Sequence, residues 1–283
     1  MSEVLLDTLI DLLKLIPFLF LTYLLMEVME HMTSDRVKLA VRRAGYAGPA
    51  VGGLLGAFPQ CGFSAAAASL YSGKLITMGT LLAVFLSTSD EMLPIFLSER
   101  VNIWLILKVI GLKVLIGIAA GFLVDVLFRS REHMKEPGAI HSMCEQEHCR
   151  CEKSIWKSAM LHTVKVLIAI AVVSFALNCL IFWMGEDTLA GFVQNQPVLG
   201  PILAGIVGLL PNCAASVVIT QLYLEGILSV GAMMSGLLVG AGVGIIILIR
   251  MNKNWKDNLR IIGLLYGIGV VSGIMIEFIE RLI

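Results

Sequence analysis

The sequence predicts an all-α polytopic membrane protein made of two inverted-topology repeats, with about 10 membrane segments. Two observations lead to this class. The chain is 58% hydrophobic and only 15% charged, which exceeds the apolar share of a typical soluble domain. In addition, a Pro-x-Cys motif occurs at matching positions in the two halves, Pro59 to Cys61 and Pro211 to Cys213. We expect one broken helix or re-entrant hairpin at each motif. The protein is therefore expected to lie in a lipid bilayer.

Six apolar stretches are long enough to cross a bilayer as a helix, which takes about 20 residues. They lie near residues 4–30, 77–98, 101–128, 157–184, 227–250 and 259–281. The first stretch lacks the short apolar core and the small-residue cleavage site of a signal peptide. We therefore expect it to remain in the mature chain.

The distribution of charge predicts an orientation. Formal net charge is zero, with 21 basic and 21 acidic residues, so the total indicates no particular partner. Most basic residues nevertheless lie on one side of the expected spans, and the positive-inside rule makes this side cytoplasmic. Both termini then lie outside, and the 129–157 loop lies in the cytoplasm. The residues on the basic side are Arg36, Lys38, Arg42, Arg43, Lys74, Arg129, Arg131, Lys135, Arg150, Lys153, Lys157, Arg250, Lys253, Lys256 and Arg260.

An internal repeat appears when the chain is shifted by 152 residues. The segment "GPAVGGLLGAFPQCGFSAAAASLYSGKLITMG" then aligns without a gap with "GPILAGIVGLLPNCAASVVITQLYLEGILSVG". Most of the identities are Gly, Pro, Cys, Ser and Tyr, which an apolar composition does not favour. They are Gly48/Gly200, Pro49/Pro201, Gly53/Gly205, Gly56/Gly208, Pro59/Pro211, Cys61/Cys213, Ser64/Ser216, Leu70/Leu222, Tyr71/Tyr223 and Gly79/Gly231. The repeat predicts that the two halves arose by duplication.

Each half is expected to contain one full helix, one broken element and two further full helices. The number of crossings per half is odd whether the broken element turns back or crosses twice, so the second half enters the membrane upside down. Interrupted segments at matching places in inverted repeats are typical of secondary transporters. We expect a first membrane repeat at 1–128, a cytoplasmic linker containing His and Cys at 129–156, and a second, inverted repeat at 157–283.

The broken elements are expected to end near the middle of the membrane. Between Tyr46 and Pro59 the helix reaches only ~20 Å into a ~30 Å hydrocarbon layer, and Pro59 ends it because proline has no N–H to donate. The restarting helix then presents its N-terminal amides, which carry partial positive charge. The groups expected at the two tips are Pro59, Gln60, Cys61 and Ser64, and Pro211, Asn212, Cys213 and Ser216. The alternative is that Pro and Gly only kink two ordinary helices, with the cysteines as buried fillers.

Two adjacent acids, Asp90 and Glu91, lie inside the expected span 77–98 at about the depth of the first tip. A carboxylate near the bilayer centre costs at least ~2.5 kcal/mol, so it normally faces a partner, a cavity or an ion. Ser87 and Thr88 precede the acids and offer hydroxyl groups, and the second half has "VGAGV" at the aligned positions. Pro94 indicates an unwound or kinked section here, which would free carbonyl oxygens to join the carboxylates. We therefore expect cation binding or proton coupling here. The alternative is an ion pair with Lys108 or Lys113.

The central loop carries a group of sulfur and imidazole side chains, which suit zinc and other soft metals. This accessory metal site would be formed by Cys144, His148, Cys149 and Cys151. Cytosolic thiols stay reduced, but the spacing differs from that of a standard zinc finger. Transient metal capture and a flexible linker both remain open.

The chain has no nucleotide-binding loop, no GxSxG element and no HExxH element. We therefore expect no enzyme, no obligatory cofactor and no nucleic-acid partner. Gradient-driven transport or a channel remains, with the bilayer and the transported solute as partners and a homo-oligomer as a further option.

The elements "GAFPQCGFS", "GLLPNCAAS" and "STSDE", with the His/Cys-containing loop, together resemble a bacterial family of ten-helix heavy-metal exporters. Its members carry labels such as manganese transporter and arsenic-efflux-like permease. The resemblance implies efflux of a metal or metalloid across the plasma membrane. Oxygen ligands from Asp90, Glu91, Gln60 and Asn212 suit manganese, whereas Cys61 and Cys213 suit softer ions.

The leading hypothesis is a divalent-cation transporter, with manganese favoured, that exports its substrate by alternating access and couples protons through one acid. The substrate would contact both tips together with Ser87, Thr88, Asp90 and Glu91. The second hypothesis is a carrier for a small organic, oxyanion or metalloid solute that binds at the helix N-termini of the tips. The third is a membrane scaffold or channel without coupled transport.

Overall fold

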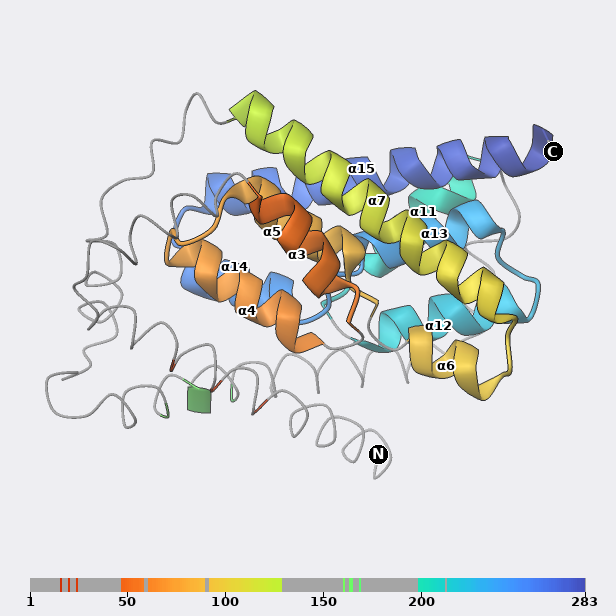
Figure 1. The fold of residues 1–283 in the computed structure, drawn as a ribbon, viewed down its shortest axis with the longest axis horizontal. Helices are drawn as coiled ribbons and strands as arrows, with labels where there is room; N and C mark the ends of the chain where they lie inside the picture. Colours follow the sequence, from red (N-terminus) through yellow and green to blue (C-terminus); the bar gives the residue numbers. More distant parts are fainter. Residues whose placement is uncertain are drawn as a thin grey trace, which may run out of the picture.

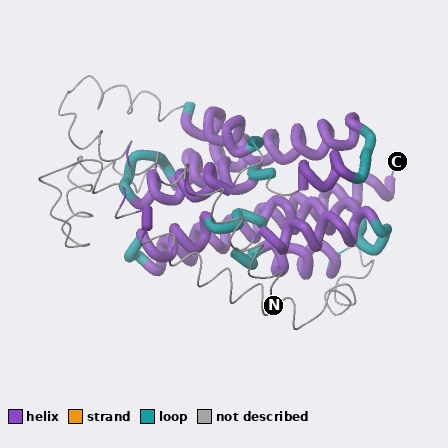
Figure 2. The backbone as a smooth tube through the Cα atoms, turned by 90° about the horizontal axis from the view of Figure 1, so that it is seen from below, coloured by secondary structure: helices purple, strands orange, loops and turns teal. Residues whose placement is uncertain are grey.

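The computed structural model describes residues 47–58, 61–89, 92–128, 198–211 and 213–282, together with isolated positions between 16 and 24 and between 160 and 168. All regular elements of this part are α-helices (Figure 2). The first half contains α3 (Gly48–Gly56), α4 (Cys61–Ser72), α5 (Met78–Ser87), α6 (Met92–Ser98) and α7 (Ile103–Phe128). The second half contains α11 (Leu199–Gly208), α12 (Cys213–Leu224), α13 (Val230–Val239), α14 (Gly244–Met251) and α15 (Trp255–Leu282).

The helices of the two halves keep the sequence offset. The start of α12 follows the start of α4 by 152 residues (213 minus 61), and the same difference separates α13 from α5, α14 from α6 and α15 from α7. The offset found in a short window therefore extends to the end of each half. The spans expected near 4–30 and 157–184 lie outside the described residues, apart from the isolated positions.

Three described segments are long and apolar enough to cross a membrane, namely Ile103–Phe128, Val230–Met251 and Trp255–Leu282. These confirm three of the expected spans. The expected span 77–98 is different, because α5 ends at Ser87 and α6 begins only at Met92. In the second half, α13 and α14 are likewise separate helices within Val230–Met251.

Each half therefore contains two interruptions rather than one, and of the two additional ones only that between α5 and α6 was expected, from Pro94. In the first half the hydroxyls of Ser87 and Thr88 donate to the carbonyls of Ala83 and Val84, both at 2.7 Å, and Thr88 has extended backbone (ψ 127°) that ends the helix. In the second half Gly240 leaves the helical region with ψ 87°. Gly242 then adopts a φ of +51°, which glycine tolerates without a steric penalty.

Within each half the first, third and fifth of these helices form one packed group: α3, α5 and α7, or α11, α13 and α15 (Figure 1). Glycines allow the closest approach. A β-carbon at Gly79 would lie 2.1 Å from the Gly121 carbonyl oxygen, and one at Gly231 would lie 2.6 Å from the Gly273 carbonyl oxygen. Both pairs are related by the same offset, so the backbones of the paired helices touch in the same way in each half.

Helices α5 and α13 lie at the centre of the described part. All residues of α5 are buried, as are Gly231 to Val239 of α13, and the two helices contact one another. Further contacts connect the halves, among them those of α4 with α14 and of α12 with α6 (Figure 1). The core is thus centred on α5 and α13, and α4 and α12 each pack in part against the other half.

Candidate functional site

The helix breaks predicted at the two Pro-x-Cys motifs are present. Helix α3 ends at Gly56 and α4 begins at Cys61, while α11 ends at Gly208 and α12 begins at Cys213. In both cases proline lies between the two helices, where its missing N–H cannot interrupt a helical hydrogen bond. The two helices of each pair are therefore separate elements in the described residues, while the role of the cysteines stays a prediction.

The ends of α3 and α11 lie against the central helices just before these break. A β-carbon at Gly56 would lie 2.2 Å from the Ser87 Oγ and 2.6 Å from the Val84 carbonyl oxygen. A β-carbon at Gly208 would lie 2.3 Å from the carbonyl oxygen of Gly236, which is aligned with Val84. In the first half, the gap between α3 and α4 is therefore next to the gap between α5 and α6. In the second half, the gap between α11 and α12 is likewise next to the gap between α13 and α14.

The first turn of α4 brings the other half into the same region. Ser64 is fully buried. A β-carbon at Gly244, the first residue of α14, would lie 3.0 Å from the Ser64 Cβ and 2.9 Å from a ring carbon of Phe85. The start of α14 therefore contacts both the start of α4 and the last turns of α5. Breaks from both halves meet at this point.

The predicted hydroxyl ligands have their own hydrogen bonds here. Ser87 and Thr88 are buried and donate to carbonyl oxygens one turn earlier in α5. Because a hydroxyl that donates keeps acceptor lone pairs, both oxygens remain able to accept from a proton donor or to bind a cation. Of the corresponding tip residues in the second half, Pro211 is half-buried, and the carbonyl of Ser216 accepts the Thr220 hydroxyl at 2.6 Å.

The remaining predicted ligands are not placed by the structure. Helices α4 and α12 begin at Cys61 and Cys213, but the side chains of these cysteines lie outside the description. The same is true of the whole of Pro59, Gln60, Asp90, Glu91, Cys144, His148, Cys149, Cys151 and Asn212. The assignment of these residues as ligands therefore stays a prediction.

A buried ammonium lies where the two central breaks, the gap between α5 and α6 and the gap between α13 and α14, approach each other. Lys113 of α7 is 1% exposed. Its Nζ donates to the carbonyl of Leu237 in α13 at 2.8 Å and to the carbonyl of Thr88, directly after α5. Lys113 thus bridges the two halves through backbone oxygens. The sequence indicated this lysine only as a partner for the acids, because a lysine inside an apolar span needs some partner.

Residues 1–181 match a family described as "Putative, 10TM heavy-metal exporter". The chain belongs to this family. It is a multi-pass membrane protein of a heavy-metal exporter family, as its resemblance to that family implied. No curated protein and no solved structure matches the chain.

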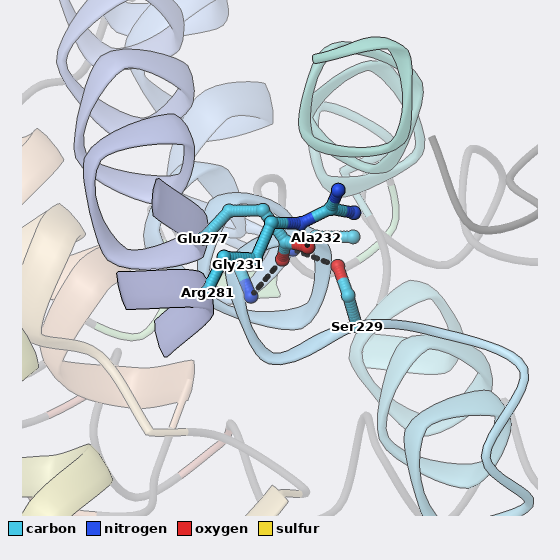
Figure 3. Close-up of polar contacts among 5 residues, drawn as sticks. All are labelled: Ser229, Gly231, Ala232, Glu277 and Arg281. Atoms are coloured by element: carbon cyan, nitrogen blue, oxygen red, sulfur yellow. Dashed lines mark hydrogen bonds and ion pairs between the residues drawn. The ribbon is translucent and has the colours of Figure 1, made fainter. Parts of the chain in front are cut away.

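A matching pair of carboxylates in the two halves was missed by the sequence analysis. The Asp125 carboxylate of α7 accepts from the Gly79 N–H at 2.9 Å and from the Thr77 hydroxyl at 2.7 Å, and the Thr77 hydroxyl caps α5. In the second half the Glu277 carboxylate accepts from the Gly231 N–H at 3.1 Å (Figure 3). Ser229 caps α13 in the same way as Thr77 caps α5.

These carboxylates act as structural groups that hold each long helix to the start of the neighbouring central helix. An acid is favourable at this place because a helix N-terminus carries partial positive charge and unpaired N–H groups. Glu277 also pairs with Arg281 at 3.1 Å (Figure 3). The signal was available in the sequence, since Asp125 and Glu277 are matching acids at the repeat offset, beyond the aligned window.

The described residues hold no group of three or more His, Cys, Asp and Glu side chains that could bind a metal. The neutral oxygens that they place near the proposed site are the hydroxyls of Ser87 and Thr88, whereas the Thr88 and Leu237 carbonyls accept from Lys113. Such oxygens bind hard cations. Charged ligands would have to come from the predicted acids between α5 and α6.

Proposed function

We propose that the protein is a secondary transporter that exports a divalent transition-metal cation, manganese favoured, across the bacterial plasma membrane by alternating access. The observation that carries this proposal is the meeting of interrupted helices from both halves, seen in the contacts of Gly56 with Ser87 and of Gly244 with Ser64. Substrate sites of secondary transporters lie where such interruptions meet near the bilayer midplane. The family assignment supports the class of substrate.

The proposed ligands surround this meeting point. Asp90 and Glu91 occupy the gap between α5 and α6 in the sequence, directly after Thr88. Carboxylate, amide and carbonyl oxygens suit Mn²⁺, whereas thiolates suit softer ions. We assign Asp90, Glu91, Gln60 and Asn212 as oxygen ligands, with Cys61 and Cys213 as the sulfur ligands that extend the range to softer metals. One of the two acids would release a proton as metal binds.

The frame for alternating access is the inverted repeat, in the proposed division into 1–128, 129–156 and 157–283. Packing of α4 on α14 and of α12 on α6 supports it, because each pair joins an equivalent helix of one half to the other half. If the halves are inverted, these two contacts face opposite sides of the membrane and are suited to open in turn. Both termini would lie outside, and the linker residues Cys144, His148, Cys149 and Cys151 would collect metal in the cytoplasm.

A carrier for a small organic, oxyanion or metalloid solute is the second candidate. The buried ammonium of Lys113 favours it, since a positive charge near a site attracts an anion. Helices α4 and α12 also begin at the tips, and helix N-termini attract negative groups.

Flux measurements test the leading proposal. Purified protein in proteoliposomes should move Mn²⁺ in a saturable manner, faster than protein-free vesicles, and the double change Cys61→Ser with Cys213→Ser should weaken flux of Cd²⁺ more than flux of Mn²⁺. Gly111→Ala is a matched control, because its position has open space around it. Absence of saturable metal flux under every imposed proton gradient would contradict the proposal.

Thermal unfolding of the purified protein separates the candidates. A rise in the unfolding midpoint with Mn²⁺, Zn²⁺ or Cd²⁺ supports the metal transporter, because a ligand that binds only the folded state stabilises it. A rise with arsenate or carboxylate anions alone supports the second candidate. No shift with either class, together with unchanged flux after mutation of both tips, favours a scaffold or an uncoupled channel.

A further inference from the structure

Lys113 is not one of the residues assigned to the metal site, yet its ammonium is held by backbone carbonyls from both halves. Its ammonium is almost fully buried and donates to backbone carbonyls of two different helices, at Leu237 and at Thr88. Burial of a charged group inside a membrane protein is costly, so such groups are held by specific partners. Here the partners come one from each half of the repeat.

Both carbonyls are oxygens that helix breaks release. In the second half, the Gly240 N–H donates to the Gly236 carbonyl, and the chain then leaves the helix at Gly240. The Leu237 carbonyl is therefore in the last turn, where carbonyls lack a helical N–H partner. In the first half, Thr88 follows the end of α5 with extended backbone, and its carbonyl also lies beyond the regular helix.

The helix dipoles act in the same direction. The C-terminal end of a helix carries about half a negative charge, and α5 and α13 both end close to the Lys113 ammonium. Both ends therefore contribute negative potential at the ammonium. Unwound carbonyls and half-helix C-terminal ends are also the groups with which secondary transporters coordinate a monovalent cation.

We propose that the Lys113 ammonium is a built-in cation that fills a monovalent-cation site formed by the ends of α5 and α13. It acts as a positioning residue that holds the two central breaks together. Insofar as it concerns transport, the inference rests on the proposed function. The aligned residue in the second half is the buried Leu265, so one lysine serves both breaks.

The inference predicts that removal of the side chain opens the site to an external cation. In Lys113→Ala, methylammonium should occupy the space of the ammonium and its neighbouring methylene, and K⁺ should bind more weakly. Methylammonium chloride should therefore raise the unfolding midpoint of Lys113→Ala above its value in choline chloride at equal ionic strength. Wild type should show no such difference, because its own ammonium already fills the site.

Two variants on the same helix provide the comparison. Lys108→Ala is the matched control, since Lys108 is exposed, and methylammonium should leave its unfolding midpoint unchanged. Lys113→Met fills a similar volume without charge, so it should show no methylammonium effect. Metal flux through Lys113→Ala should fall by about tenfold or more because two buried carbonyls lose their donor, and methylammonium should restore part of it.

These measurements test the cation site independently of metal transport. Methylammonium stabilisation that is specific to Lys113→Ala supports the cation site even if wild type moves no metal. Equal shifts in wild type, Lys108→Ala and Lys113→Ala would overturn it, as would wild-type stability of Lys113→Met. If neither Lys113→Ala nor Lys113→Met folds, Lys113→Arg decides: a folded Lys113→Arg supports the need for charge, and its failure to fold contradicts it.

Discussion

The two central breaks have the same position in their repeats but different chemistry. Between α5 and α6 the chain reads Thr-Ser-Asp-Glu, and between α13 and α14 it reads Gly-Ala-Gly-Val. Side-chain hydroxyls and extended backbone end the first helix, whereas glycine conformations end the second. Both halves thus share the interruption, while the polar side chains of these two gaps all belong to the first half.

The same division applies farther from the breaks. The carboxylate caps Asp125 and Glu277 are present in both halves and hold equivalent helices together. Lys113, by contrast, has the apolar Leu265 as its counterpart, and both are buried. The carboxylates that hold the helices together are therefore duplicated, whereas the buried charge of Lys113 near the central breaks is not.

The largest effect is expected from removing the acids of the first break. Asp90→Asn with Glu91→Gln should lower Mn²⁺ flux by about 100-fold, because loss of charged ligands costs on the order of 3 kcal/mol. Val243→Ala changes the position aligned with Glu91 and should keep most of the flux. Similar losses in both variants would remove the distinction between the two breaks, and unchanged flux in the acid variant would exclude the site assignment.

The next largest effect concerns the shared frame. Gly56→Ala and Gly208→Ala should both destabilise the protein by about 1–3 kcal/mol, because the new β-carbon meets backbone oxygens at 2.6 Å and 2.3 Å that cannot rotate away. The matched controls are Gly111→Ala and Gly263→Ala, whose surroundings are open. These should be neutral or slightly stabilising. Thermal unfolding of the four variants checks the expectation, and a neutral Gly208→Ala would contradict the close approach.

A smaller and equal effect is expected at the two caps. Asp125→Ala and Glu277→Ala each remove an acceptor for the first N–H groups of a central helix, which should cost about 1–2 kcal/mol. Unfolding midpoints should fall by a similar amount in both variants. If only one variant is destabilised, the two caps are not equivalent parts of the frame.

The smallest effect distinguishes the two matching tyrosines. Tyr71 donates to the Asp257 carboxylate at 2.8 Å, whereas Tyr223 packs its ring against Phe96 with centroids 6.2 Å apart. Tyr71→Phe should therefore cost about 1 kcal/mol, and Tyr223→Phe should change stability less because the ring contact remains. Equal changes in unfolding midpoint would show that the Tyr71 hydrogen bond contributes nothing in the membrane protein.

Local signals in the sequence predicted much of this frame. Proline at positions 59 and 211 interrupts a helix whatever surrounds it, and the apolar length of α7 and α15 identifies them as spans. The break after Val239 could not be predicted in this way. Glycine is common in membrane helices, and the stretch there has no proline or charge, so whether the helix continues depends on contacts with the other half.

The partners of the polar residues were harder to predict than the residues themselves. Asp125 and Glu277 could have been found by extending the repeat comparison past Gly79 and Gly231. The contact of Lys113 with Leu237 joins residues 124 positions apart, and no periodicity relates them. Backbone carbonyls become ligands only where a helix ends, so this part of the site depends on the second break in each half. Pro94 indicated the break in the first half, whereas no local signal indicated the one in the second half.

The most direct test of the central claim is the position of bound metal. A structure of the protein with Mn²⁺, determined with anomalous scattering at the manganese absorption edge, should show one peak between the α5–α6 break and the starts of α4 and α12. The same peak should be absent from the Asp90→Asn, Glu91→Gln variant. A peak at the α13–α14 break that persists in this variant would contradict the claim that Asp90 and Glu91 bind the metal.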